Sequence, residues 1–135
     1  MAEIYASSMV DESRPLPDRR VVLNSDACYW FLYNYFEAAN LPPRQHELIG
    51  LYDDGEISGY QLQRLIEELE EAKTDVENKP EHFSVLTGWD GGSVTKATEI
   101  RRNVERKELL DLIGELLTLG REALAINGKL ILIGD

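Results

Sequence analysis

The chain has 135 residues, of which 43% are hydrophobic and 29% are charged, and this size and composition suffice for one ordinary hydrophobic core. Its longest apolar run, 27–33, is far shorter than the roughly 20 residues that cross a bilayer, and the N-terminus lacks the basic and apolar segments of a secretory signal. A net charge of −11 disfavours direct binding to nucleic acid or to anionic membranes. We therefore expect a single cytoplasmic domain, 1–135, that binds no nucleic acid directly and no membrane.

The N-terminal third predicts a pair of strands followed by a helix. Segments 2–10 and 19–23 are rich in β-forming residues and are separated by a loop that contains two prolines. Ser25 precedes apolar residues at helical spacing and can accept the amide hydrogens of a first turn, which predicts a helix over 26–39. The Leu-Pro-Pro sequence at 41–43 ends that helix, because proline has no amide hydrogen to donate.

The middle of the chain predicts two further helices joined by a turn. A short helix is expected over 43–52 and ends in the Asp-Asp-Gly turn at 53–55. Ser58 is placed to cap the next helix. Apolar residues then repeat at helical spacing while acids occupy the other faces, which predicts an amphipathic helix over 59–77.

The following segment predicts an antiparallel hairpin and the longest helix. Segments 82–89 and 93–104 flank an Asp-Gly-Gly sequence whose glycines can adopt the positive φ angles of a tight turn. A broad leucine-rich stripe predicts a helix over 105–127, with Gly128 as its C-terminal cap. Gly114 and Gly120 weaken this helix, a cost that close packing against a neighbour can offset.

The apolar run 130–133 predicts a strand that is buried on both faces or inserted between other strands. Together the segments indicate an α+β fold, in which a small, mainly antiparallel sheet carries helices 26–39, 59–77 and 105–127 packed chiefly on one face.

Negative charge is concentrated in the middle of the sequence. Between residues 47 and 81 there are eleven acids and three bases, so this segment carries a charge of −8. Four carboxylates lie on consecutive turns of the predicted helix 59–77, namely Glu67, Glu68, Glu70 and Glu71. They form either a solvated face or a surface that recognises a basic partner.

The predicted helix 26–39 contains six of the eleven aromatic residues. The residues at one helical stripe are expected to face the core, and they are Cys28, Phe31, Leu32, Tyr35 and Phe36. This leaves Tyr29, Trp30 and Tyr33 on another side, to be covered either by a second layer of the protein or by a partner. Tyrosine and tryptophan suit a partner surface because they combine a large contact area with a polar group.

A locally basic segment follows the predicted hairpin turn and contains Lys96, Arg101, Arg102, Arg106 and Lys107, with Glu99, Glu105 and Glu108 interleaved. We expect these bases to balance charge by pairing with the acidic helix 59–77, although exposed pairs contribute little stability.

The acids around the predicted turn, Asp53, Asp54 and Glu56, surround a glycine as in a calcium-binding loop. The ligand positions of such a loop are nevertheless occupied by Gly50, Tyr52 and Gln61, so calcium is not expected. One cysteine excludes an internal disulfide and a thiolate zinc cluster, and no phosphate loop or nucleophile elbow is present. We expect no catalytic residue, no metal and no cofactor.

These observations favour a non-enzymatic protein-binding domain, such as a small acidic inhibitor, antitoxin or immunity protein that masks a basic partner. Its binding residues are expected on the acidic helix, at Asp53 and Asp54, and at Tyr29, Trp30 and Tyr33. Two alternatives stay open: an enzyme or accessory subunit with an acid-lined loop site, and a structural subunit that forms homo-oligomers through its aromatic helix.

Overall fold

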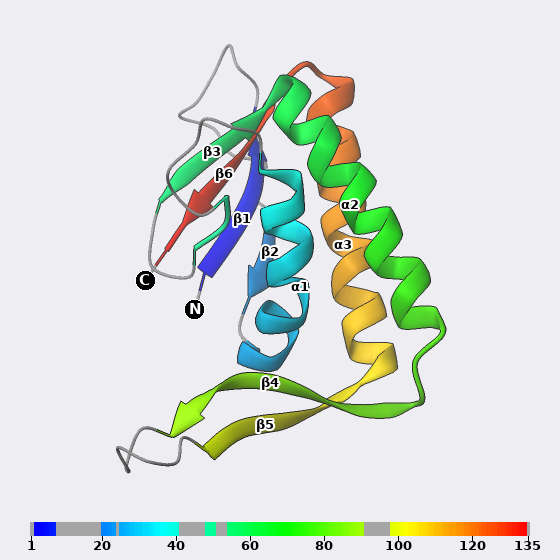
Figure 1. Cartoon of the computed structure of the whole chain (residues 1–135). Coiled ribbons are helices and arrows are strands. Elements are labelled where there is room, and N and C mark those ends of the chain that lie inside the picture. Colours follow the sequence, from blue (N-terminus) through cyan, green and yellow to red (C-terminus); the bar gives the residue numbers. More distant parts are fainter. Residues whose placement is uncertain are drawn as a thin grey trace.

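The computed structural model describes residues 2–7, 20–23, 25–40, 48–50, 54–90 and 98–134. It has an α+β architecture with three helices, a four-stranded sheet and a two-stranded sheet, as the sequence predicts (Figure 1). None of the described helices combines the length and the apolar character needed to cross a membrane.

The four-stranded sheet is antiparallel throughout and has the order β2-β1-β6-β3. Its strands are β1 (Ala2–Ser7), β2 (Arg20–Leu23), β3 (Gly55–Ser58) and β6 (Lys129–Ile133). The pairing of β1 with β2 confirms the strand pair expected near the N-terminus. β6 lies between β1 and β3, which confirms that the apolar C-terminal run is inserted between other strands and explains why it is continuously apolar.

β3 was not predicted, and it starts at the glycine of the expected 53–55 turn. Gly55 to Ser58 pair with Leu132 to Lys129 of β6, so this segment is extended rather than part of a helix-joining turn. The expected short helix 43–52 lies mostly outside the described residues, and the described part, 48–50, is not helical.

The three helices form a layer on one face of the four-stranded sheet (Figure 1). Their bounds, α1 (Asp26–Ala39), α2 (Gly59–Glu77) and α3 (Arg106–Ala125), agree closely with the predicted ranges. The Ser25 hydroxyl accepts the Cys28 amide hydrogen at 3.4 Å, which confirms the predicted N-cap. Ser58 occupies the N-cap of α2 but makes no side-chain capping bond.

The residue with left-handed backbone angles at the end of α3 is not the glycine that was expected there. Asn127, with φ of 55°, takes the left-handed conformation in place of Gly128. The Gly128 amide then donates to the Ala123 carbonyl at 2.7 Å, and the Asn127 amide donates to Leu124 at 3.1 Å. This pair of bonds is a Schellman motif, in which Gly128 is the second residue after the helix cap.

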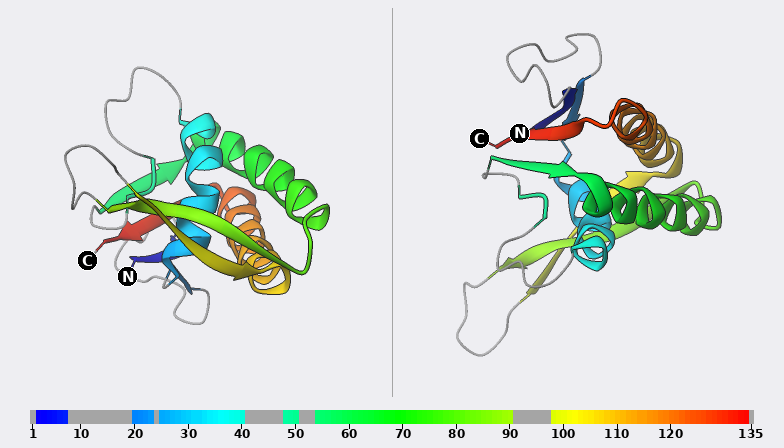
Figure 2. Two further views of the ribbon diagram at one scale, coloured as in Figure 1. Left: turned by 60° about the horizontal axis from the view of Figure 1, so that its bottom comes forward. Right: turned by 90° about the horizontal axis from the view of Figure 1, so that it is seen from above.

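The hairpin of β4 (His82–Asp90) and β5 (Thr98–Glu105) confirms the predicted antiparallel pair. It crosses α1 on the side away from the four-stranded sheet, so that α1 lies between the two sheets (Figure 2). Leu32 and Phe36 of α1 are fully buried, and Phe31 contacts Phe83 of β4 with ring centroids 5.7 Å apart. A helix with protein on both sides needs apolar residues around most of its circumference, which accounts for the aromatic content of α1.

Candidate functional site

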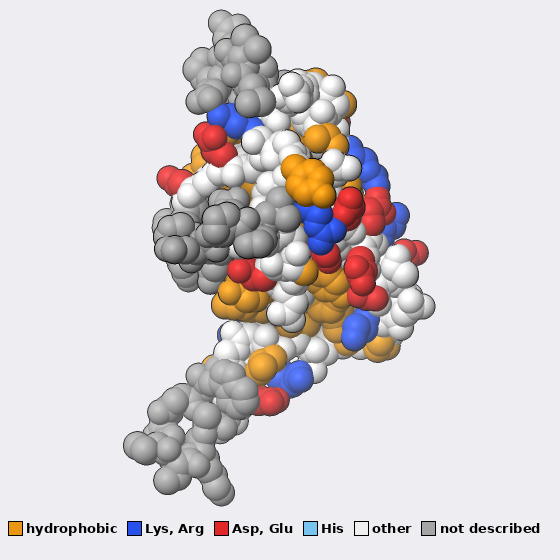
Figure 3. All heavy atoms as spheres, turned by 45° about the horizontal axis from the view of Figure 1, so that its top comes forward, with side chains coloured by type: hydrophobic (Ala, Val, Ile, Leu, Met, Phe, Trp, Pro, Cys, Tyr) orange, Lys and Arg blue, Asp and Glu red, His pale blue; other side chains and the backbone are white. Residues whose placement is uncertain are grey.

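The four expected binding carboxylates of α2 are partly neutralised by bases within the protein. Arg64 pairs with Glu67 at 2.5 Å and with Glu68 at 3.0 Å, and Glu70 pairs with Arg121 of α3. Basic and acidic side chains accordingly lie close together on the side of the molecule where α2 runs (Figure 3). Glu71 is exposed and has no ion pair with a described residue.

The expected pairing of the basic segment with α2 is wrong for its four described members, none of which has an ion pair with α2. Arg101 pairs with Glu99 at 3.3 Å, and Lys107 pairs with Asp111 at 3.1 Å, each within its own element. These partners are two and four residues away in the chain, so the pairs form locally without the two charged segments meeting. Lys96 lies outside the described residues.

The acids near β3 have partners in the sheet. Asp54 accepts the Gly134 amide hydrogen at 2.8 Å, and Glu56 pairs with the buried ammonium of Lys129 at 3.1 Å. These carboxylates join β3 to the C-terminal strand. Asp53 lies outside the described residues.

The three expected aromatic binding residues have different environments. Tyr29 is 2% exposed and its hydroxyl donates to the Ile49 carbonyl at 2.7 Å, so its side chain belongs to the core and offers almost no surface to a partner. Trp30 is 38% exposed and lies with its ring centroid 5.3 Å from that of the half-buried Tyr33. The aromatic surface therefore reduces to Trp30 and Tyr33.

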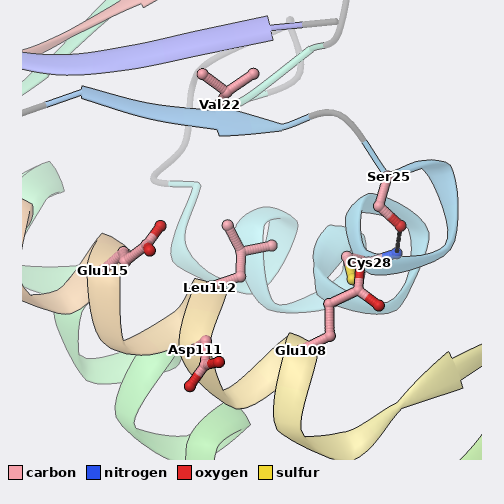
Figure 4. A pocket seen from close by; sticks show the side chains of 7 residues that line it. All are labelled: Val22, Ser25, Cys28, Glu108, Asp111, Leu112 and Glu115. Carbon is pink, nitrogen blue, oxygen red and sulfur yellow. Dashed lines mark hydrogen bonds between the residues drawn. The ribbon is translucent and has the colours of Figure 1, made fainter.

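An acid-rimmed pocket of about 350 Å³ lies where β2, the N-terminus of α1 and α3 meet. In Figure 4, Leu112 of α3 points toward Val22 of β2, and Glu108 extends toward the first turn of α1. The complete lining is Val22, Ser25, Cys28, Glu108, Asp111, Leu112 and Glu115. We call this cavity the α3 pocket.

Helical geometry brings the pocket's acids together. Glu108, Asp111, Leu112 and Glu115 are separated by three, four and seven residues, so they share one face of α3. Asp111 pairs with the exposed Lys107, whereas Glu108 and Glu115 have no ion pair with a described residue. The pocket thus combines two unneutralised carboxylates with an apolar surface.

The sulfur in this pocket is poorly suited to nucleophilic chemistry. Burial raises the pKa of the Cys28 thiol, contact with the Ser25 hydroxyl lowers it, and the negative charge of Glu108 raises it. Because burial dominates, the thiol is kept protonated at neutral pH, and the thiolate is the reactive form. Cys28 therefore acts as a small buried hydrophobe, as the sequence predicts.

The sequence interpretation missed this pocket. It treated Glu108 only as an acid among bases and did not single out Asp111 or Glu115. The spacing of these acids beside Leu112 is visible in the sequence, but the opposite walls come from residues about 80 to 90 positions earlier, Val22 and Cys28.

Within the described parts of the chain, no three His, Cys, Asp or Glu side chains are grouped so that they could hold a metal ion. No known protein family, curated protein or solved structure matches this chain, so its function has to be argued from its own residues.

Proposed function

We propose that this chain is a non-enzymatic binding domain that engages a basic protein, in the manner of an acidic inhibitor, antitoxin or immunity protein. The observation that carries the proposal is the α3 pocket, where Glu108 and Glu115 stand beside the apolar surface of Val22 and Leu112. Lysine and arginine side chains have an aliphatic stem and a cationic end, and they match both parts of such a pocket.

The wider charge distribution supports the same class of partner. A net charge of −11 attracts a basic protein over several ångströms and raises the rate of encounter. On α2, Glu67, Glu68 and Glu70 contribute to this field with part of their charge offset by Arg64 and Arg121, while Glu71 contributes without an ion pair to any described residue. We assign the ion-paired acids of α2 to steering and the α3 pocket to contact.

The test is a comparison of two double variants of equal charge. The chain is tagged and used to capture proteins from a lysate of its native cell at low salt, then eluted at high salt. Glu108→Gln with Glu115→Gln removes the two pocket charges that lack an ion pair with a described residue, and Glu77→Gln with Glu81→Gln removes two exposed charges between the last residue of α2 and the start of β4. Binding constants for the captured protein are then measured with purified components.

We expect a basic protein that is released by salt, and an affinity that falls about tenfold or more in the pocket variant but much less in the control. The basic-partner proposal fails if no protein is held at low salt, or if binding ignores both salt and every acid substitution. Equal losses in the two variants would leave a basic partner but remove the α3 pocket as its contact.

A further inference from the structure

A groove of about 470 Å³ runs between α1 and β4. Seven of its ten lining residues carry rings or aliphatic side chains, and the other three are Asn34, Lys79 and Ser84. The apolar residues used below are Trp30, Phe31, Tyr33, Tyr35, Phe83 and Leu86. Phe31 of α1 contacts Phe83 of β4, with the ring centroids 5.7 Å apart and the planes inclined at 64°. We call this cavity the aromatic groove.

The hairpin covers the aromatic face of α1 incompletely. Phe83 packs on Phe31, but Trp30 remains 38% exposed and Tyr33, Tyr35 and Leu86 are half-buried. Aromatic side chains already held in a wall lose little conformational freedom when a partner covers them, so an incompletely covered set of rings favours docking of a further apolar side chain.

Two carboxylates of α2 lie beside the aromatic groove, outside its lining, and one of them is hydrogen-bonded to a lining residue. The Tyr35 hydroxyl donates to Asp75 of α2 at 2.5 Å, and Glu71 lies one helical turn before Asp75. Both carboxylates are exposed and neither has an ion pair with a described residue. Burial, the bond to Asp75 and the negative charges of Asp75, Glu71 and Glu68 raise the pKa of Tyr35.

The lining of the aromatic groove contains one charged side chain, Lys79, whose positive charge is already engaged. The Lys79 ammonium lies 5.8 Å from the centroid of the Phe83 ring, a cation–π arrangement. Lys79 follows Asp75 by four residues, so along the chain the negative charges of Glu71 and Asp75 are followed by this positive charge.

We infer that the aromatic groove docks a partner segment in which an aromatic or large aliphatic side chain enters between α1 and β4 while a neighbouring lysine or arginine pairs with Glu71 and Asp75. The inference rests on the proposed function, because it takes the partner to be basic. It adds an apolar anchor to that partner and a second contact surface separate from the α3 pocket.

The probe is a five-residue peptide with phenylalanine flanked by two lysines on each side, titrated into the ¹⁵N-labelled full chain and followed by NMR. We expect shifts of the Trp30 indole and of α1 and β4 amides. A peptide with alanine in place of phenylalanine should bind about tenfold more weakly, because it buries less apolar surface. Replacing the lysines with glutamine should also weaken binding and remove its salt dependence.

Variants of the chain assign the contacts. Trp30→Ala and Leu86→Ala remove opposite walls and should each weaken the phenylalanine peptide severalfold, with folding checked by urea unfolding. Glu71→Gln should weaken binding and flatten its salt dependence, whereas Glu77→Gln, at an exposed acid six residues further along α2, should not.

The outcomes separate this inference from the proposed function. If the phenylalanine and alanine peptides bind equally and shift only α3 amides near 108–115, the groove inference is overturned while the basic-partner proposal stands. If the peptide binds in the groove equally well without its lysines, the assigned role of Glu71 and Asp75 is overturned. Shifts at neither site, together with failure of the capture experiment, would remove both.

Discussion

At the scale of single residues, the Tyr29 hydroxyl joins α1 to the segment 48–50 through its bond to the Ile49 carbonyl at 2.7 Å. Tyr29→Phe leaves a buried carbonyl with one donor fewer, so we expect the free energy of unfolding to fall by about 1–2 kcal/mol in a urea titration. Tyr60→Phe is the control, because Tyr60 is 68% exposed and should change stability by less than about 0.5 kcal/mol. Equal effects at the two positions would contradict the structural role of Tyr29.

Tyr35 makes the free energy of unfolding depend on pH, and the direction of this dependence follows from its raised pKa. Its pKa is raised above the usual 10.0, so the folded protein holds this proton more tightly than the unfolded chain does. The resulting stability is complete below pH 10 and is lost as the pH rises above it. Urea unfolding at pH 8 and near pH 11 should therefore show a larger loss for the natural protein than for Tyr35→Phe, and parallel losses would contradict the assignment.

At the scale of elements, the two glycines inside α3 have different surroundings. A Cβ at Gly114 would meet no atom within 4 Å, whereas one at Gly120 would lie 3.3 Å from Cγ1 of Ile66 on α2. Gly114→Ala should raise the free energy of unfolding by about 0.5–1 kcal/mol, because alanine favours the helix. Gly120→Ala should gain clearly less, because Ile66 has to move. A urea titration showing equal gains would argue against close packing of α2 and α3 at Gly120.

The elements that the sequence predicts well are those with a signal inside the segment. Ser25 and the apolar spacing of 26–39 define α1, and the same periodicity defines α2 and α3. β3 has four residues, including Gly55 and Glu56, and no local pattern typical of a strand. It is extended because β6 supplies its hydrogen bonds, and no rule applied to residues 55–58 alone contains that partner.

At the scale of the whole molecule, net charge opposes compactness. With a charge of −11, self-repulsion should be screened by salt, and the free energy of unfolding should rise by up to about 1 kcal/mol between about 20 mM and about 200 mM NaCl. Glu77→Lys with Glu81→Lys lowers the negative charge by four at exposed positions and should reduce this rise. A rise of the same size in the natural protein and the variant would show that net charge is not its cause.

The surroundings of the expected binding residues depend on packing across the whole molecule. The sequence shows that Glu67, Glu68, Glu70 and Glu71 are acidic and helical, but not that Arg121 of α3 reaches Glu70. It shows an excess of aromatic residues, but not which of them the hairpin and the 48–50 segment cover.

The α+β class, the extents of three helices, the hairpin and a C-terminal strand can be predicted from the sequence alone, because periodicity, caps and turn residues act within a segment. Three features follow from the packing of the chain: α1 lies between two sheets, Tyr29 is buried while Trp30 is exposed, and Glu108 and Glu115 border a pocket with Val22. Burial, charge neutralisation and cavity shape arise between residues far apart in the chain, so they are properties of the packed molecule and not of any one segment.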